Sequence, residues 1–396
     1  MADDDAAAVL EGIAPEAVAD LAAELITAAG QGEMGTEEVT ARVLSEHARD
    51  LGLDASSTVV APQRPNVRII TPDAGAEPGL LLLGHTDVVP AGTGWRTDPY
   101  QPVVRDGRLY GRGAADMLGG LAAALVAMGA LARSGVRLRG PVELAAVVDE
   151  EELGIGIRDF ITDPAHLTHA GCVVAEPTDL QTIVAARGAS YIEIDVHGRA
   201  AHAGNPADGR NAIYGAAAIV ADLEAWHAEL AADAHPLAGA ATWNVGVVTG
   251  GVGGSMVPDH CRISADRRLL LPGEDPEQVL AEVRERIAGL GLDRRGLAVD
   301  VLMPMNMPGF ETDPASALVR AATAAVPAAG GPDLPVGGWT AACDGGFLAR
   351  DAGIPVVVLG PGSVTEQAHR PNESVALEDL TTAAGAYALM ALNLLT

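Results

Sequence analysis

Residues 79–120 constrain the fold of this chain more than any other stretch. An uninterrupted apolar run, Leu80 to Leu83, is followed by His85 and Asp87, then by a loop rich in glycine and proline, and then by Asp116 just before a long apolar segment. A short apolar run bounded by turn residues is typical of a buried strand. In open α/β sheets, ligand sites lie at the carboxyl ends of the strands. We therefore expect His85 and Asp116 at such an edge, as candidate metal ligands.

Asp87 lies two residues after His85, so on an extended strand the two side chains would share a face. A carboxylate in that position can accept the second imidazole N–H and hold the ring of a metal ligand in place. His85 and Asp87 are also compatible with residues that merely cap a turn. Only the rest of the chain favours the metal-site interpretation.

Other apolar runs also end in polar residues. They are Pro141–Val148 before Asp149–Glu152, Cys172–Ala175 before Glu176, and Pro355–Leu359 before His369. Alternation of such strands with helical segments predicts an α/β fold with a doubly wound, mostly parallel sheet. Taken alone, the acidic run is typical of a solvated helix start, Glu176 of a loop and His369 of a surface. Together at one edge, the carboxylates would repel one another unless a cation lies among them.

The middle of the chain has a different pattern. Its expected strands, Tyr191–His197, Thr242–Val248 and His260–Leu271, alternate apolar and polar residues, and helices are expected at 209–231 and 276–290. This order predicts a two-layer α+β module. We therefore expect a catalytic domain in two parts, residues 1–186 and 305–396, interrupted by an inserted domain, residues 187–304.

Composition excludes several classes of function. The 53 acidic residues outnumber the 25 basic ones, for a net charge of −28, so binding to nucleic acid or to an anionic membrane is not expected. The three cysteines form no CxxC pair, which favours a reducing compartment. The N-terminus has no basic segment typical of a secretory signal, and no apolar run has transmembrane length. We expect a cytoplasmic protein.

The polar residues at the strand ends fit a pair of metal ions. Zinc binds imidazole and carboxylate groups, and two-metal hydrolases need a bridging carboxylate and further ligands on each ion. Asp116 could bridge, with His85 and Glu176 on one ion, and His369 with one glutamate of the acidic run on the other. One carboxylate is then left over to act as a general base on water.

Five motifs resemble those of a known metallopeptidase family. They are GHTDVVP, the DG-x-LYGRGA-x-D stretch that ends at Asp116, VVDEEELGIG, AEPT and AHRPNE. In this order and spacing they resemble the family of acetylornithine deacetylase, succinyl-diaminopimelate desuccinylase, aminoacylase and glutamate carboxypeptidase. The resemblance extends into the insertion, where RGRAAHAGNPADGRNAI is similar to the family's pattern.

The resemblance implies a catalytic domain with two zinc ions and an inserted lid domain that often dimerises. By resemblance, Asp116 bridges the ions and Glu150 is the general base, while Asp87 orients His85. The implied ligands are His85 and Glu176 for one ion, and Glu151 and His369 for the other. A register shifted by one residue, with Glu151 as base and Glu152 as ligand, is the alternative.

The resemblance also implies residues that contact the substrate. His202 matches a lid histidine that stabilises an oxyanion in a neighbouring subunit, and Arg268 matches a lid arginine that pairs with a substrate carboxylate. Gly360 and Gly362 match a loop that lines the substrate pocket. Each of these positions is also compatible with an ordinary turn or surface residue. The sequence departs from the family at Leu118, where lysine is common, and at Ser255, where asparagine is common.

These observations lead us to expect a metal-dependent amidohydrolase that cleaves a small N-acyl amino acid or dipeptide-like substrate. Zinc is the expected metal, and cobalt or manganese would fit the same ligands. We expect a homodimer formed through the inserted domain. The alternatives are the same site acting on a specialised-metabolite amide, including amide formation, and a non-catalytic binding protein.

Overall fold

The computed structural model of the chain describes residues 2–31, 35–269 and 274–396. The last two residues of the expected strand His260–Leu271 lie outside these ranges. The chain divides into two compact units. The first unit is made of Met1–Ala185, Phe310–Gly338 and Cys343–Thr396, and the second of Ala186–Gly309 and Trp339–Ala342.

The first unit is built on a mixed sheet. Within the described residues the sheet has nine strands in the order β1-β2-β6-β3-β7-β19-β8-β17, and β18 pairs with β8. The strands are β1 (Asp54–Ala61), β2 (Arg64–Ile70), β3 (Gly79–His85), β6 (Val142–Val147), β7 (His169–Val174), β8 (Ile183–Ala186), β17 (Phe310–Glu311), β18 (Gly337–Trp339) and β19 (Val356–Val358).

The centre of this sheet is parallel. Strands β6, β3, β7 and β19 run in the same direction, whereas β1, β2 and β8 pair antiparallel with their neighbours. Every residue of β3 and β6 is buried, as expected of strands covered on both faces. The predicted α/β fold is confirmed, with the qualification that its sheet is parallel only in the middle. The four parallel strands bring their carboxyl ends to one edge.

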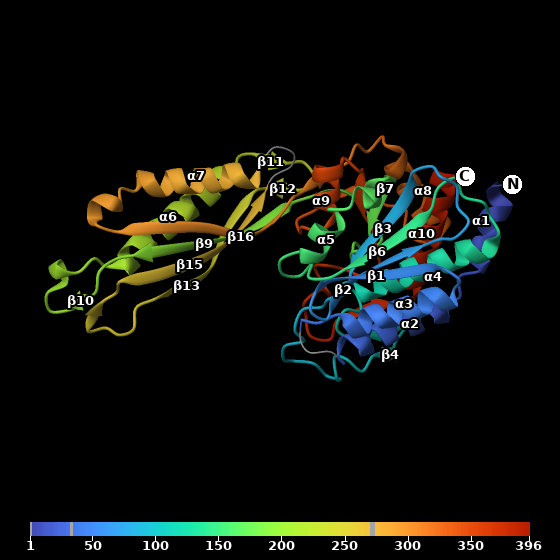
Figure 1. Cartoon of the computed structure of the whole chain (residues 1–396), viewed down its shortest axis with the longest axis horizontal. Coiled ribbons are helices and arrows are strands. Elements are labelled where there is room, and N and C mark those ends of the chain that lie inside the picture. The colour runs from blue at the N-terminus through green and yellow to red at the C-terminus, as the bar shows by residue number, and fades with distance from the viewer. Residues whose placement is uncertain (1, 32–34, 270–273) are drawn as a thin grey trace. The chain divides into compact units, whose positions relative to one another are not determined.

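Helices cover both faces of the sheet (Figure 1). In the first unit they are α1 (Ala2–Glu11), α2 (Pro15–Ala29), α3 (Glu38–Asp50), α4 (Leu118–Ser134), α5 (Ile155–Phe160), α8 (Ala317–Ala328), α9 (Gly345–Phe347) and α10 (Leu377–Leu395). Helix α9 contacts Val174 and Val356, whose side chains point away from the face that carries Val173. A small sheet of β4 (Val103–Arg105), β5 (Arg108–Tyr110) and β20 (Ser374–Ala376) completes the unit.

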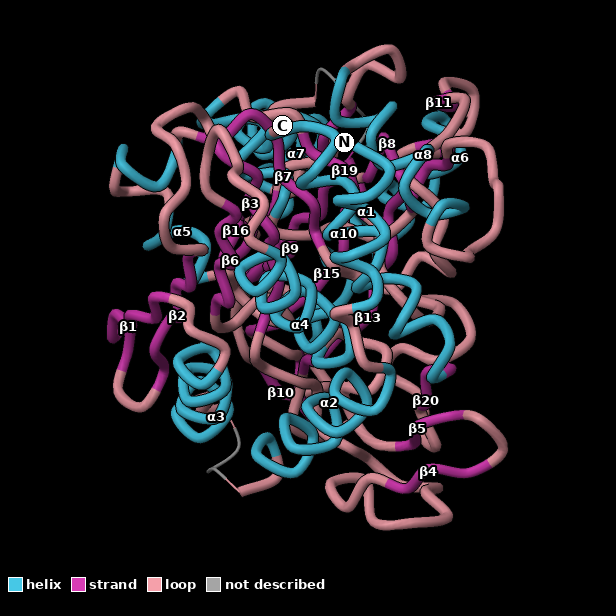
Figure 2. Tube along the Cα trace, turned by 90° about the vertical axis from the view of Figure 1, so that its right-hand side faces the viewer, coloured by secondary structure: helices cyan, strands magenta, loops and turns pink. Residues whose placement is uncertain are grey.

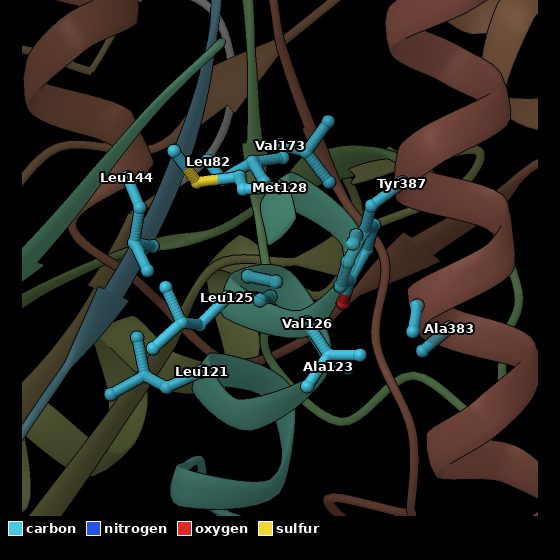
Figure 3. Close-up of a cluster of buried hydrophobic side chains, with 14 of the residues drawn as sticks. Leu82, Leu121, Ala123, Leu125, Val126, Met128, Leu144, Val173, Ala383 and Tyr387 are labelled. Atoms are coloured by element: carbon cyan, nitrogen blue, oxygen red, sulfur yellow. The ribbon is translucent and has the colours of Figure 1, made fainter. Parts of the chain in front are cut away.

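The main hydrophobic core lies between the sheet and α4. Leu82, Leu144 and Val173 come from three neighbouring strands and pack with Leu125 of α4, while Tyr387 of α10 closes the cluster (Figure 3). Helices α2 and α10 pack against α4 (Figure 2). Nearly all of α4 is therefore buried, which explains why its sequence is apolar on every side.

Two glycines allow α4 to approach the sheet at the edge where the parallel strands end. A Cβ atom on Gly119 would collide with the carbonyl oxygen of Ala114, and one on Gly120 with the carbonyl oxygen of Ala175. Ala175 lies just before Glu176, and Asp116 lies just before α4. This close approach therefore brings the start of α4 next to the end of β7.

Replacing Gly120 by alanine is expected to destabilise the protein. The added methyl group meets a backbone carbonyl that cannot rotate away, so the free energy of unfolding should fall by about 1–3 kcal/mol. Gly289→Ala is the control, because a Cβ at this exposed position of α7 (Pro276–Gly289) meets nothing within 4 Å. Urea unfolding of both variants tests the expectation, and equal stabilities would contradict it.

The second unit has two layers. Its four-stranded antiparallel sheet has the order β13-β15-β9-β16, formed by β13 (Thr242–Gly250), β15 (His260–Leu269), β9 (Gly188–His197) and β16 (Ala298–Met307). Helices α6 (Ala212–Leu230) and α7 cover one face and bury Ile192, Ile194 and Val196 (Figure 1). The short pairs are β10 (Ala201–His202) with β14 (Met256–Val257), and β11 (Ala234–His235) with β12 (Gly239–Ala240). The predicted α+β character is confirmed, and β16 is an additional strand.

The open face of this sheet carries a charged cluster around Asp195. Its Oδ1 accepts hydrogen bonds from His260 Nε2 (2.7 Å) and Arg262 Nε (2.9 Å), and its Oδ2 accepts one from Arg262 (2.7 Å). The hydrogen bonds from Arg262, helped by His260 and opposed by burial, lower the pKa of Asp195 to about 2. The ionised carboxylate therefore stabilises the folded state above its unfolded pKa of about 4.

Asp195→Asn is expected to lower the free energy of unfolding by an amount that depends on pH. Because the folded pKa is lowered, the difference in unfolding free energy between wild type and variant should be constant above about pH 5 and shrink as the pH falls below about 4. Urea unfolding of both proteins at several pH values measures this difference. A difference that stays constant down to pH 3 would contradict the proposed ion pairing.

None of the helices in the described part of the chain has the length and apolar character that a membrane span needs.

Candidate metal centre

The predicted ligands of the first unit lie at the carboxyl edge of the parallel strands. His85 is the last residue of β3, the segment Asp149–Glu151 follows β6, and Glu176 follows β7. His369 lies in the loop after β19, and Asp116 precedes α4. These ligands come from five separate segments, which the order of the strands brings together.

His85 faces two carboxylates. Its Nε2 lies 3.3 Å from Asp116 Oδ1 and 3.3 Å from Glu176 Oε1, and this buried nitrogen has no hydrogen-bond partner among the described residues. Its Nδ1 lies 3.0 Å from the main-chain carbonyl oxygen of Asp87. A carbonyl oxygen can only accept, so Nδ1 carries the proton of the neutral ring, and this form presents a lone pair at Nε2. Three electron-pair donors thus converge, as the coordination of a cation requires.

A second group of ligands adjoins the first. His369 Nε2 lies 2.9 Å from Glu151 Oε2 and 3.2 Å from Asp116 Oδ2. In each group, one possible ligand atom per residue lies within 4.8 Å of the others. Asp116 belongs to both groups and presents a different oxygen to each histidine. The arrangement fits two cations that share one carboxylate.

The site concentrates negative charge in a buried space. Burial, followed by the charge of Asp116, raises the pKa of Glu176 to about 7. Burial also raises the pKa of Glu150 well above its ordinary value. Hydrogen bonds to Asp116 and then to Glu151 raise the pKa of His369 to about 10. Carboxylates crowded in this way repel one another unless cations compensate them, which agrees with the two ligand groups.

The backbone of the acidic run is held by Asp87. Its Oδ1 accepts a hydrogen bond from the N–H of Glu150 (3.2 Å), and its Oδ2 one from the N–H of Glu151 (3.1 Å). The carboxylate lies 3.5 Å from His85 Nδ1, farther than the Asp87 carbonyl oxygen. Asp87 was expected to orient His85 through its carboxylate. Both the carbonyl oxygen and the carboxylate of Asp87 lie beside the His85 ring, and the carboxylate also holds the acidic run, so the orienting role of Asp87 stays a prediction.

The glutamates of this run differ in burial. Glu150 is largely buried, and its Oε2 lies 4.0 Å from His85 Nε2, whereas Glu152 is exposed. Asp149 holds the start of the run, because its Oδ2 accepts a hydrogen bond from the N–H of Leu153 (3.2 Å). Asp149 is held in turn by Arg64 (2.6 Å). Glu150 and Glu151 therefore lie on a loop that hydrogen bonds hold in place, and both face the candidate metal ligands.

The predicted substrate loop packs against the segment that carries Glu176. Gly360 N–H donates to Thr178 Oγ1 (3.2 Å), and the N–H of Asp179 donates to the Gly362 carbonyl oxygen (2.6 Å). Both glycines are buried. A Cβ on Gly360 would lie 2.5 Å from the carbonyl oxygen of Glu176. Gly360 and Gly362 thus fit tightly against the strand end that supplies Glu176.

The remaining predicted residues belong to the second unit. His202 is exposed on β10, and its Nδ1 accepts a hydrogen bond from the N–H of Gly204 (3.0 Å). Its Nε2 therefore carries the proton in the neutral ring. Arg268 lies on β15, and its Nε donates to Asp266 Oδ1 (2.9 Å).

Several buried charged residues near the site were not among the predicted ones. Arg112 and Glu373 form an ion pair beside Asp116, and their positions within the LYGRGA and AHRPNE motifs could have drawn attention to them. Asp344 is buried, and neither of its carboxylate oxygens has a hydrogen-bond partner among the described residues. Neither the five motifs nor the spacing of the apolar runs indicates Asp344 or Arg64.

The sequence comparison agrees with this geometry. Residues 81–393 match the model of the family described as peptidase family M20/M25/M40. The chain belongs to this family. The resemblance inferred from the five motifs is thereby confirmed, and the protein is a metal-dependent peptidase or amidohydrolase.

Solved structures share the fold of this family member. A tripeptidase from Staphylococcus aureus has a TM-score of 0.75 and 23% identity, over 96% of this chain and 98% of that chain. A metallo-carboxypeptidase of family M20 from Sulfolobus solfataricus has a TM-score of 0.77 and 20% identity, over 94% and 98%. A dinuclear metal-binding peptidase of the family from Bacillus subtilis has a TM-score of 0.72 and 17% identity, over 96% and 98%. At these identities the likeness concerns the fold.

Proposed function

We propose that the protein hydrolyses the amide bond of a small N-acyl amino acid or dipeptide-like substrate, using two divalent metal ions. The observation that carries this proposal is the pair of ligand groups that share Asp116, with the unpartnered Nε2 of His85 facing two carboxylates. Similar solved structures described as a tripeptidase and a metallo-carboxypeptidase support a peptide-like substrate. Zinc is the first candidate for the metal, and cobalt or manganese would suit the same ligands.

The residues divide into ligands and a base. In this proposal His85 and Glu176 hold one ion, Glu151 and His369 hold the other, and Asp116 bridges them. When bound, such ions supply Lewis acidity that polarises an amide carbonyl and makes a nearby water more acidic. The fit rests on the chemistry of the donor atoms, since zinc in hydrolases accepts imidazole nitrogens and carboxylate oxygens as ligands.

Glu150 is the proposed general base. It is largely buried, it faces His85 Nε2 at 4.0 Å, and it belongs to neither ligand group. Its carboxylate would accept a proton from the attacking water as the new C–O bond forms. It would then pass that proton to the nitrogen of the leaving amine as the C–N bond breaks. The exposed Glu152 does not offer this geometry.

The second unit is proposed to act as a lid and to form a homodimer. Its strand β13 lies at the edge of the sheet and exposes Val247 and Val248, which a second copy could cover by pairing strand to strand. In such a dimer the protonated Nε2 of His202 would stabilise the oxyanion in the neighbouring subunit, and Arg268 would bind a substrate carboxylate. A contact of Gly360 and Gly362 with the substrate remains a prediction, as does the cytoplasmic location.

Metal content and turnover test the proposal together. Protein purified without added metal is analysed for its elements, and hydrolysis of N-acetyl amino acids, N-succinyl amino acids and dipeptides is followed before and after chelation. About two ions per chain and chelator-sensitive turnover are expected. Two ions with turnover only on other amides would redirect the proposal to a specialised substrate. Turnover that survives complete removal of metal would overturn it.

A further inference from the structure

An ion pair between Arg112 and Glu373 lies directly behind the proposed bridging carboxylate. Arg112 Nη1 donates to Glu373 Oε2 at 2.6 Å, although the two residues are 261 positions apart in the sequence. Arg112 is 1% exposed and Glu373 is 0% exposed. Neither residue belongs to the two ligand groups. A fully buried ion pair is costly to desolvate, so the surrounding groups must stabilise it.

Glu373 accepts hydrogen bonds from the backbone that carries Asp116. Its Oε1 accepts from the N–H of Ala115 (2.9 Å) and the N–H of Asp116 (3.0 Å), and its Oε2 accepts from the N–H of Gly113 (3.1 Å) as well as from Arg112. Four donors therefore converge on a single carboxylate. Because one of these donors belongs to Asp116 itself, a displacement of Glu373 would displace Asp116.

Arg112 connects this carboxylate to one further loop and to another part of its own loop. Its guanidinium lies within hydrogen-bonding distance of the carbonyl oxygens of Ala91 (3.3 Å) and Arg370 (3.5 Å) and stacks over the ring of Trp95. Arg370 is adjacent to His369, and Glu373 lies four residues after His369 in the same loop. The pair thus fastens the segment that supplies Asp116 to the segment that supplies His369.

We propose that Glu373, held by Arg112, is a positioning residue that sets the distance between Asp116 and His369 and thereby the affinity for the metal ions. The inference rests on the ligand set proposed above. Neither residue is a candidate ligand, so both would act on the metal ions through the backbone and through Asp116. Groups that orient metal ligands in this way contribute about 10–100-fold to metal affinity.

A second ion pair in the same unit provides a control, since its carboxylate is buried like Glu373, although the side chain of its Arg68 is 32% exposed. Glu143 is 1% exposed and accepts hydrogen bonds from Arg68 at 2.6 Å and 2.8 Å. It lies near the start of β6, and about 13 Å of strand separates it from the carboxyl end of β6, where the candidate metal centre lies. Glu143→Gln removes a buried charge from an ion pair without touching the candidate ligands. It separates a general loss of stability from a specific loss of metal binding.

The test uses the metal-free full chain and Co²⁺ as the probe. Co²⁺ is titrated in competition with a chromophoric chelator, the visible absorption of the bound ions is recorded, and urea unfolding of each metal-free variant is measured in parallel. In Glu373→Gln, an amide nitrogen replaces one acceptor oxygen and faces N–H donors. We expect its dissociation constant for Co²⁺ to rise about 10–100-fold, with a changed absorption spectrum. Glu143→Gln should bind Co²⁺ within about twofold of wild type, even where both variants lose stability.

A milder variant keeps the test informative if Glu373→Gln does not fold. Arg112→Lys retains the charge but loses the planar fork that connects the loops, so it should weaken Co²⁺ binding less than Glu373→Gln. Folded Glu373→Gln and Arg112→Lys proteins that bind Co²⁺ as tightly as wild type would overturn the positioning role. Wild-type protein that binds no Co²⁺ would instead overturn the ligand set, so the two failures are distinguishable.

Discussion

Glu150→Gln is expected to lower kcat by about 10²–10⁴-fold and to leave the metal content unchanged. Glutamine has nearly the same shape but cannot accept a proton from water at neutral pH. Glu150 lies outside both ligand groups, so its replacement removes the proposed base and no ligand. The measurement is the steady-state rate on whichever panel substrate the wild type turns over, together with elemental analysis of the variant.

Two neighbouring variants serve as controls for Glu150→Gln. Glu152 is exposed, so Glu152→Gln should retain kcat within about twofold. Glu151→Gln should lower metal content, because Glu151 faces His369 at 2.9 Å. If Glu151→Gln kept both ions while losing turnover, and Glu152→Gln lost an ion, the register shifted by one residue would be correct.

Asp116→Ala is expected to remove both metal ions and to abolish turnover. Asp116 presents one oxygen to His85 at 3.3 Å and the other to His369 at 3.2 Å, so its loss damages both ligand groups at once. His85 and His369 each belong to a single group. His85→Ala and His369→Ala are therefore each expected to retain about one ion per chain.

Elemental analysis of the three dialysed variants distinguishes a shared ligand from separate ones. Near-zero metal in Asp116→Ala, beside about one ion in each histidine variant, is the expected pattern. Circular dichroism and urea unfolding establish that each variant is folded before its metal is counted. About one ion retained by Asp116→Ala would contradict the bridging role.

The fold class could be predicted because buried parallel strands have a recognisable composition. Strands such as β3 and β6 are covered on both faces, so they read as apolar runs. Strand β16 was not predicted, since it is an edge strand that includes Asp300 and Asn306. Helix α1 and strand β1 were not predicted either, because polar residues predominate at the start of the helix and along much of the strand.

The candidate ligands could be predicted because four of them, His85, Glu151, Glu176 and His369, come after apolar runs and Asp116 comes just before one. What could not be predicted is how side chains from distant segments share their hydrogen bonds. Asp87 was expected to act on His85, and its carboxylate, which lies 3.5 Å from that ring, also holds the backbone of Glu150 and Glu151. The pairing of Arg112 with Glu373 likewise depends on two loops that meet only in the folded chain.

The sequence by itself determined the α/β class and the residue types gathered at the carboxyl edge, because burial and ligand chemistry are properties of individual residues and their spacing. Only the tertiary structure decided which of the neighbouring glutamates is buried, which oxygen of Asp116 faces which histidine, and which carboxylate braces the backbone. These outcomes depend on distances between segments far apart in the chain. Such distances are set by the packing of α4 and the loops on the sheet.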